Sequence, residues 1–264
     1  MRVALRVAAI LAIVSTAGEA QSLDEAQRLF YSGRYEASAA IARDIRTADA
    51  GNLAAIELRA SALHFQIKRA IGDVKDKDEA WKRCAACPAW MADFLAETAQ
   101  GQTAARAALA LDPEDDDARF FLGKLDLNYV WLQLGTLGHK TGWSEYWEAR
   151  KSLDAVLKRN PEHVRAQVAR AWIDYIVDTK LPRGTRWLLG GGNKTRGLLT
   201  VREAAQKDAG FFEQAEAGFG LWDMQVRERN FTDALVTARR LARDFPDNEE
   251  LTRFIARQDP TSIR

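Results

Sequence analysis

The sequence predicts an all-α fold, a solenoid of stacked helical hairpins, on three observations. The 264 residues are rich in Ala, Leu, Arg and Glu and contain only six prolines, a composition that favours helices. No stretch alternates apolar and polar residues as a half-buried strand does. Residues 109–123 and 156–171 are similar segments about 48 positions apart. In each, a helix end is followed by an Asp-Pro or Asn-Pro break and a new helix start, which is typical of a helical-hairpin repeat.

Residues 1–20 have the composition of a cleavable signal peptide. Two arginines precede a short apolar run over residues 7–14, and small residues ending at Ala17 and at Ala20 suit signal peptidase. The run is shorter than the ~20 residues of a membrane-spanning helix, although an uncleaved anchor is the alternative. No cysteine follows, which excludes a lipoprotein anchor at this site. We therefore expect export, in a bacterium to the periplasm, with no stable membrane span after cleavage.

The mature chain is expected to be electrically neutral. The whole sequence has a formal charge of +1, and without residues 1–20 it has 36 basic and 36 acidic residues. It lacks the overall basic charge of a nucleic-acid-binding protein or of a polybasic membrane-surface protein. Residues 21–257 are expected to form one helical-repeat domain, since a solenoid of any length is one unit, followed by a tail over residues 258–264.

Three helices are predicted in the N-terminal part of this domain. Helical spacing of apolar residues predicts a helix over residues 23–31, with Ser22 as N-cap and Glu25 completing a capping box. After a Ser-Gly pair a second helix is predicted over residues 35–45, and a third over residues 52–71. The next segment is less regular: a charged linker covers residues 72–79, and residues 81–111 are expected to hold one or two helices.

The only two cysteines, Cys84 and Cys87, lie in this less regular segment. In an oxidising compartment two cysteines at this spacing can form a disulfide. We expect a structural disulfide or two unreactive thiols, with redox exchange as the alternative that the spacing leaves open. Pro88 stands where a haem-attachment motif has His, and no second pair of ligands suggests zinc.

Two insertions of equivalent position distinguish the middle of the chain. Helical-hairpin repeats are often ~34 residues long, so a period near 48 leaves about 14 extra residues per unit. The extra residues are 128–142 and 177–193, each between the first and second helix of a hairpin. Stacking is expected to bring them side by side on one edge, and insertions on one face of a repeat protein often form its binding face.

The last unit is expected to be a regular repeat. A helix is predicted over residues 211–227, a turn at residues 230–234 and a helix end at residues 245–248. A short helix over residues 249–257 would then cap the stack with a polar face.

Tryptophans concentrate around the insertions, where five of the eight lie between Trp131 and Trp187. Trp147 and Trp172 fall on predicted helices and are expected in the core. Trp131, Trp143 and Trp187 lie in or beside the insertions. They are either anchors for a partner or buried rings that hold the insertions in place, which is the more common use of tryptophan.

Residues 190–195, Gly-Gly-Gly-Asn-Lys-Thr, do not fit a nucleotide-binding loop, which needs a glycine directly before the lysine and a preceding strand. Backbone N–H groups and arginines at this helix start suit a carboxylate or phosphate; alternatively the glycines form a tight turn with Asn193 as N-cap. The complete candidate binding face contains aromatic, cationic and glycine positions: Trp131, His139, Lys140, Trp143, Arg183, Arg186, Trp187, Gly191, Gly192, Asn193 and Lys194.

Asp126 and Asp174 occupy matched positions among apolar residues of the two middle repeats. Near a helix C-terminus a carboxylate opposes the helix dipole, so each is expected to have an Arg or Lys partner or an N–H donor. A position repeated with the fold indicates a structural role. The sequence contains no catalytic constellation, and neither a cofactor nor a metal site is predicted. We therefore do not expect an enzyme.

The segment Leu-Phe-Tyr-Ser-Gly-Arg-Tyr-Glu-Ala-Ser, residues 29–38, resembles the turn of a tetratricopeptide repeat (TPR). Residues 122–131, 142–150 and 184–194 resemble a group of exported bacterial TPR proteins of undefined role. The resemblance implies a right-handed α-solenoid of TPR-like hairpins, with middle repeats extended by inter-helix insertions, that binds proteins and has no catalytic residues. The extended repeats and the segment 72–100 depart from the pattern.

Two functional hypotheses follow from these observations. The first is a periplasmic scaffold or adaptor that holds a protein or peptide of the cell envelope on the inserted edge or in a concave groove. The alternative is a small-ligand-binding accessory protein of a periplasmic transport system. An enclosed apolar cavity beside Trp131 and Trp187 would favour the ligand binder, and an open surface would favour the adaptor.

Overall fold

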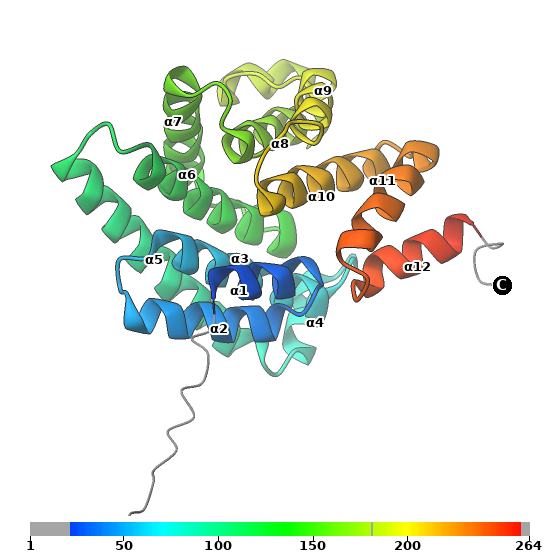
Figure 1. The fold of residues 1–264 in the computed structure, drawn as a ribbon, viewed down its shortest axis with the longest axis horizontal. Helices are drawn as coiled ribbons and strands as arrows, with labels where there is room; N and C mark the ends of the chain where they lie inside the picture. Colours follow the sequence, from blue (N-terminus) through cyan, green and yellow to red (C-terminus); the bar gives the residue numbers. More distant parts are fainter. Residues whose placement is uncertain (1–21, 181, 260–264) are drawn as a thin grey trace, which may run out of the picture.

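The computed structural model describes residues 22–180 and 182–259 (Figure 1). This part of the chain consists of helices and connecting segments, with no strand in it, which confirms the predicted all-α class. The signal peptide predicted over residues 1–20 and most of the predicted tail lie outside the described residues.

The helices of the N-terminal half are α1 (Leu23–Tyr31), α2 (Tyr35–Ala48), α3 (Leu53–Ile71), α4 (Lys77–Arg83), α5 (Cys87–Leu111) and α6 (Asp116–Val130). Those of the C-terminal half are α7 (Trp143–Arg159), α8 (Val164–Lys180), α9 (Lys194–Ala204), α10 (Phe211–Arg227), α11 (Phe231–Asp244) and α12 (Glu249–Gln258). The predicted bounds 23–31 and 211–227 agree with α1 and α10, and the irregular segment contains two helices, α4 and the long α5.

Polar side chains cap the starts of many of these helices, which is why several helix starts could be predicted from the sequence. Seven N-cap residues accept a hydrogen bond from a backbone N–H in the first turn of their helix: Ser22, Asn52, Asp76, Asp115, Asn193, Asn230 and Asn248. Such a cap satisfies one of the N–H groups that a helix start leaves without a partner. The predicted caps Ser22 and Asn193 are among them.

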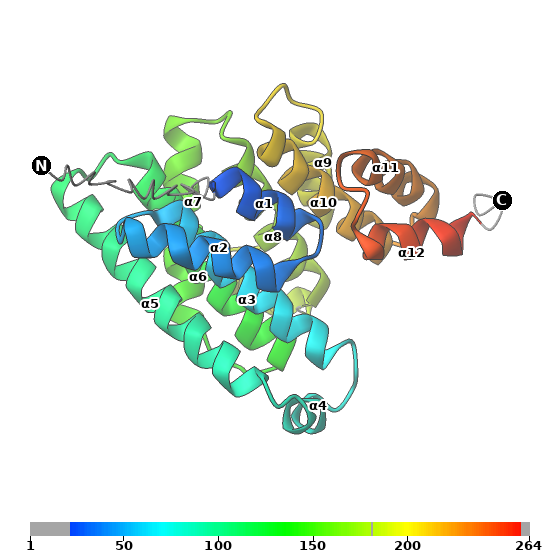
Figure 2. The ribbon, with the colours of Figure 1, turned by 60° about the horizontal axis from the view of Figure 1, so that its bottom comes forward.

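Most helices pack against the next helix along the chain, and several also touch the helix after that, as α1 does α3 and α8 does α10. The short α4 packs on α3, and α5 packs on α3 and α6. The chain therefore forms packed helix pairs (Figures 1 and 2). The first helix also contacts the C-terminal half of the chain, because α1 touches α10. The Tyr31 ring stacks on Phe219 at 5.4 Å between centroids, and Asn248 Nδ2 donates to the carbonyl of Tyr31 at 2.7 Å.

A buried ion network joins the inner helices α3, α6, α8 and α10. Arg165 of α8 lies 3.2 Å from Glu57 of α3 and 2.5 Å from Glu216 of α10, and Lys124 of α6 lies 2.6 Å from Glu216. Burial opposes ionisation of Glu216, but Arg165 and Lys124 outweigh it and lower its pKa to about 2. Where these side chains pair, helices α3, α6, α8 and α10 contact one another directly. These residues therefore do not line the concave groove that the sequence analysis considered as a binding site.

The two predicted insertions are helical, and they differ. The first begins inside α6 and continues as a π-helix, η1 (Trp131–Leu137), with no break in the chain direction. The second follows α8 as a separate 3₁₀-helix, η2 (Arg183–Leu189). Both lie between the two helices of a pair, as expected, η1 between α6 and α7 and η2 between α8 and α9.

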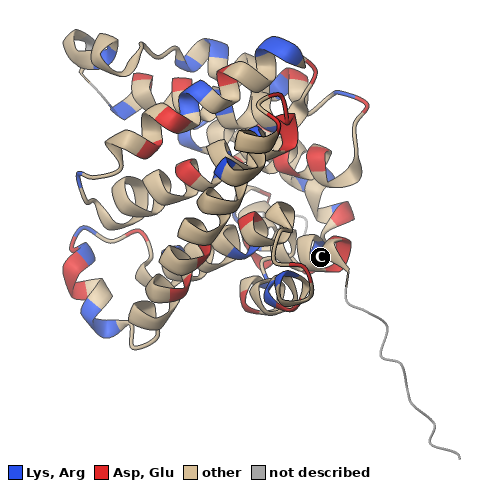
Figure 3. Ribbon diagram, turned by 90° about the vertical axis from the view of Figure 1, so that its left-hand side faces the viewer, with Lys and Arg blue, Asp and Glu red and all other residues tan. Residues whose placement is uncertain are grey.

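Charged residues of both signs are spread over the helices, in agreement with the nearly neutral composition (Figure 3). None of the helices in the described ranges is both long and apolar enough to cross a membrane.

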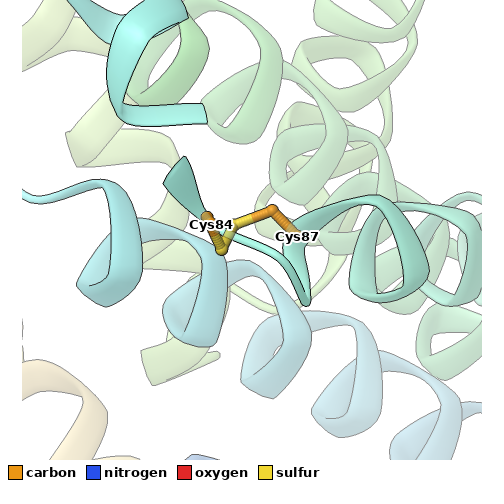
Figure 4. The surroundings of a disulfide bond; sticks show 2 residues. All are labelled: Cys84 and Cys87. Carbon is orange, nitrogen blue, oxygen red and sulfur yellow. A yellow bond between two sulfur atoms is a disulfide. The ribbon is translucent and has the colours of Figure 1, made fainter. Parts of the chain in front are cut away.

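Cys84 and Cys87 form a disulfide between the end of α4 and the start of α5 (Figure 4). Their Cα atoms are 5.4 Å apart, Cys87 is fully buried and Cys84 partly so. Both pack with Trp81, Trp90 and the buried face of α3. The disulfide therefore attaches the short α4 to the core, in the segment of residues 72–100 that departs from the TPR pattern.

Candidate functional site: the aromatic face

The first insertion belongs mainly to the core. Leu132 is fully buried in η1, and Thr136 Oγ1 lies 3.0 Å from Nε2 of the buried His64. Burial, with a contribution from Lys68, lowers the pKa of His64 to about 3, so this contact involves a neutral imidazole. The predicted binding residue Trp131 is half-buried against the cluster formed by α6, α7 and α8. Its position matches the packing interpretation.

The other predicted residues of the first insertion lie at its exposed end. His139 and Lys140 are exposed, and His139 Nδ1 lies 2.9 Å from Oε1 of Gln133, within the same insertion. Trp143, the first residue of α7, is exposed to about half its surface.

The second insertion presents its apolar residues to solvent. Trp187 is 73% exposed and Leu188 is 54% exposed, whereas Leu189 turns inward and packs on the α6–α8 cluster. Trp187 Nε1 donates to the carbonyl of Gly184 at 3.0 Å, so the indole lies along η2 itself. Of Arg183 only the backbone belongs to the described structure.

Two residues of α7 that the sequence analysis missed hold η2 in place. Tyr146 Oη donates to the carbonyl of Leu189 at 2.8 Å. Arg150 donates to the same carbonyl at 3.1 Å and to the carbonyl of Gly190 at 2.8 Å. Carbonyls at a helix C-terminus lack partners within the helix, so these donors satisfy the end of η2. The second insertion is thus attached to the helix that follows the first.

The prediction that Trp147 lies in the core is wrong, because it is 44% exposed. Helix α7 turns the stripe Tyr146, Ala149, Leu153 and Val156 inward, and Trp147 falls beside that stripe. Trp172, the other tryptophan assigned to the core, does pack there, between α8 and its neighbours. We call the four exposed apolar residues of α7 and η2 the aromatic face: Trp143, Trp147, Trp187 and Leu188.

The glycine-rich segment forms a tight turn between η2 and α9. Gly191 has a φ of +74°, and a Cβ on Gly192 would stand only 2.8 Å from the carbonyl oxygen of Asp174. Asn193 accepts from the N–H of Arg196 at 2.8 Å, and the N–H of Lys194 donates to Asp178 Oδ2 at 2.7 Å. The carboxylate of Asp178, which also pairs with Arg186, therefore takes the position at the start of α9 considered above for an external anion.

Asp174 has the basic partners expected for it. Arg170 and Arg196 each approach its carboxylate to 2.6 Å. Asp126, at the matched position, is fully buried and accepts only from the amide of Gln102 at 2.6 Å, while its Oδ2 has no hydrogen-bond partner. Burial, together with the charge of Glu148, raises the pKa of Asp126 to about 8.

Two open surface pockets lie away from Trp131 and Trp187. One, of about 560 Å³, is open and lined by residues 75–78 and 137–139. The other, of about 270 Å³, lies between α9, α10 and α11. Neither includes Trp131 or Trp187. Within the described ranges, no three His, Cys, Asp or Glu residues come together as metal ligands.

Comparison of the chain with known protein families and with curated proteins found no match.

Proposed function

We propose that this chain is a helical-repeat scaffold that binds a protein partner through the aromatic face. In this proposal the packed helix pairs form a TPR-like solenoid, and the protein works in the periplasm after removal of residues 1–20. The scaffold needs no catalytic residues, because its role is to hold the partner.

One observation carries the proposal: exposed apolar side chains on a fixed support. Trp187 and Leu188 are largely exposed on η2, while Tyr146 and Arg150 bind the end of that element to α7. Gathered exposed apolar side chains on a soluble surface commonly mark an interaction site, and tryptophan is enriched among residues that dominate binding energy. A fixed support lowers the entropy cost of binding.

The same geometry favours a protein partner over a small ligand. Small-ligand pockets bury most of the ligand surface in a concave site. Here Trp131 is half-buried against the core and Trp187 projects into solvent, so the two rings do not face each other across an enclosed cavity. Exposed apolar side chains of this kind suit a macromolecular partner that supplies much of the contact surface itself.

The test is recovery of partners from envelope extract with the purified mature protein as bait. The double variant Trp187→Ala/Leu188→Ala removes half of the aromatic face at exposed positions, so its folding should be unaffected. The matched control is Phe231→Ala/Val236→Ala, two exposed apolar residues of α11. We expect the first variant to lose the partner and the control to retain it. Equal recovery with all three proteins would contradict the proposal.

Export is tested separately. Mass spectrometry of the protein recovered from the periplasmic fraction should show a mature N-terminus after Ala17 or Ala20. Retention of the full-length chain in the cytoplasm would contradict periplasmic localisation without bearing on the aromatic face.

A further inference from the structure

The charge of the chain is unevenly distributed around the second insertion. Residues 179–202 contain no Asp or Glu, although the chain as a whole has almost equal numbers of the two signs. The basic residues of this stretch are Lys180, Arg183, Arg186, Lys194, Arg196 and Arg202. Figure 3 shows η2, next to the grey residue 181, projecting from the body of the molecule at the upper left.

Several of these cations form ion pairs with carboxylates from other helices, and those carboxylates are less exposed than the cations. Arg196 bonds to Asp174, and the arginine side chain is 62% exposed whereas the aspartate is 7% exposed. Lys194 likewise covers Glu228, and Arg186 covers Asp178. In these three pairs the cation is the more exposed partner, whereas Asp233 is slightly more exposed than its partner Arg202. The three pairs therefore present positive charge at the surface, although their neighbourhood is partly neutralised.

Further lysines surround the aromatic face. Lys151 lies one turn after Trp147 on the same side of α7, Lys140 precedes α7, and Lys180 ends α8 just before η2. All three are exposed, and their ammonium groups form no ion pair with the described residues. Lysines therefore lie close in sequence to the residues of the aromatic face, both on α7 and just before η2, while the acidic residues of α7 beside the tryptophans are Glu145 and Glu148, of which Glu148 is paired with Arg106.

We propose that the partner docks with an acidic segment, in which Asp or Glu side chains flank one or more apolar anchors. This inference rests on the proposed function and specifies its partner. The apolar anchors would contact Trp143, Trp147, Trp187 and Leu188, and the carboxylates would meet the outward cations around them. Complementary charge of this kind speeds association and selects the partner, and charge-assisted hydrogen bonds give it direction.

The observations favour an acidic protein segment over an anionic membrane surface. Lipid recognition by charge alone is typical of clusters of about four to eight basic residues close to a bilayer. Here Arg186, Lys194 and Arg196 share carboxylates within the chain, which reduces the long-range attraction. These bonds also hold the cations in fixed directions, and a fixed donor suits a partner carboxylate at a defined position.

The test uses a set of synthetic amphipathic helical peptides with one apolar face in common. Each is about 18 residues long, or five turns, and the polar face consists of Glu, Gln or Lys. Binding to the complete mature protein is measured by isothermal titration calorimetry at about 0.05 M and about 0.3 M salt. We expect the Glu peptide to bind at least about tenfold more tightly than the Lys peptide, and to weaken severalfold at the higher salt concentration.

Two variants locate the binding. Lys151→Glu/Lys180→Glu reverses two exposed charges beside the aromatic face, and Lys82→Glu/Arg83→Glu makes the same change on α4, far from η2 in Figures 1 and 2. We expect the first variant to bind the Glu peptide about tenfold more weakly than the wild-type protein does, and the second variant to bind it with unchanged affinity. Trp187→Ala/Leu188→Ala should also weaken it, because the apolar contact is lost.

Several outcomes would overturn the proposal. Equal binding of the three peptides, or equal effects of the two charge reversals, would exclude an acidic segment at this face. Binding to phosphatidylglycerol vesicles that depends on Trp187 and Leu188, without binding of the Glu peptide, would assign the face to a membrane. If envelope partners are lost with Trp187→Ala/Leu188→Ala but are insensitive to salt and charge reversal, the proposed function stands and the acidic partner is wrong.

Discussion

The helix pairs α6–α7 and α8–α9 each have an extra helical segment between their two helices, and the two segments differ in burial. The first continues α6 as η1 and places Leu132 and Leu137 in the core. The second leaves α8, starts again as η2 after Pro182, and exposes Trp187 and Leu188. The equivalent position of the two segments therefore does not give them the same environment. Whether they pack inward or project depends on which of their side chains reach a neighbouring helix.

The aspartates of the two repeats differ in the same way. Asp174 faces Arg170 one turn earlier and Arg196 on α9. The corresponding position before Asp126 is Leu122, and α7 brings Glu148 and Glu145 near it. The nearby Arg106 forms its ion pair with Glu148, not with Asp126. One of the two aspartates is therefore an ion-paired carboxylate, and the other is a buried carboxyl group whose pKa is raised to about 8. A shared backbone plan does not impose a shared electrostatic environment.

The largest expected effect comes from truncating the buried insertion. Leu132→Ala should lower the free energy of unfolding by about 3–4 kcal/mol, because removing a fully buried leucine side chain leaves a cavity. Leu188→Ala, its counterpart in the exposed insertion, should change the free energy by less than about 0.5 kcal/mol. Urea unfolding followed by circular dichroism measures both. Similar losses for the two variants would mean that η2 is as well packed as η1.

The next effect tests the ion-paired aspartate. Asp174→Ala leaves Arg170 and Arg196 without their shared carboxylate, and breaking a buried pair is costly for the partner left behind. Because Arg196 is largely exposed and Arg170 retains Asp154, we expect the free energy of unfolding to fall by about 2–3 kcal/mol, less than the roughly 3–5 kcal/mol of a fully buried pair. Asp126→Ala is the matched control. If both alanine variants lose equal stability at neutral pH, ion pairing does not distinguish the two positions.

The pH dependence of stability tests the other aspartate. The pKa of Asp126 is raised in the folded state, to about 8 from its ordinary value of 3.8, so the folded protein retains a proton that the unfolded chain releases. Its contribution is fully present below about pH 4 and is lost as the pH rises through about 8. Between about pH 5 and about pH 7, the free energy of unfolding of the wild-type protein should therefore fall by about 2 kcal/mol relative to that of Asp126→Asn. This lies within the limit of about 1.4 kcal/mol per pH unit for one proton.

Unfolding of the wild-type protein and of Asp126→Asn at several pH values measures this difference, because Asn cannot titrate. A constant difference across that range would show that Asp126 is ionised in the folded protein.

How much of this the sequence could predict depends on the range of the interactions. Local signals were sufficient for α1 and α10, since Ser22 caps the first and apolar spacing defines both. The orientation of α7 was not readable, because Trp147 and Tyr146 are both apolar and only packing against α6 and α8 shows which one points inward. The contact of Tyr31 with Phe219 joins residues far apart in the sequence, and no local pattern predicts such a pair.

The same limit applied to the candidate site. The aromatic and glycine positions were recognisable from composition, and Asn193 from its position before a helix. Tyr146 and Arg150 were not, because their role depends on carbonyls of η2 about 40 residues away. Their spacing of four residues on one side of a helix was the available signal, but it did not indicate what they bind.

The smallest expected effect is on the attachment of the exposed insertion. Tyr146→Phe removes the hydrogen bond to the carbonyl of Leu189 and keeps the buried ring, so it should cost about 1 kcal/mol of global stability or less. Hydrogen exchange of the amides in residues 183–193 should nevertheless become faster, because Arg150 alone then holds the end of η2. Amides of η1 serve as the internal control and should keep their wild-type rates. If both insertions exchange faster together, η2 is not an independently attached element, and the contrast between the two repeats lies in surface exposure alone.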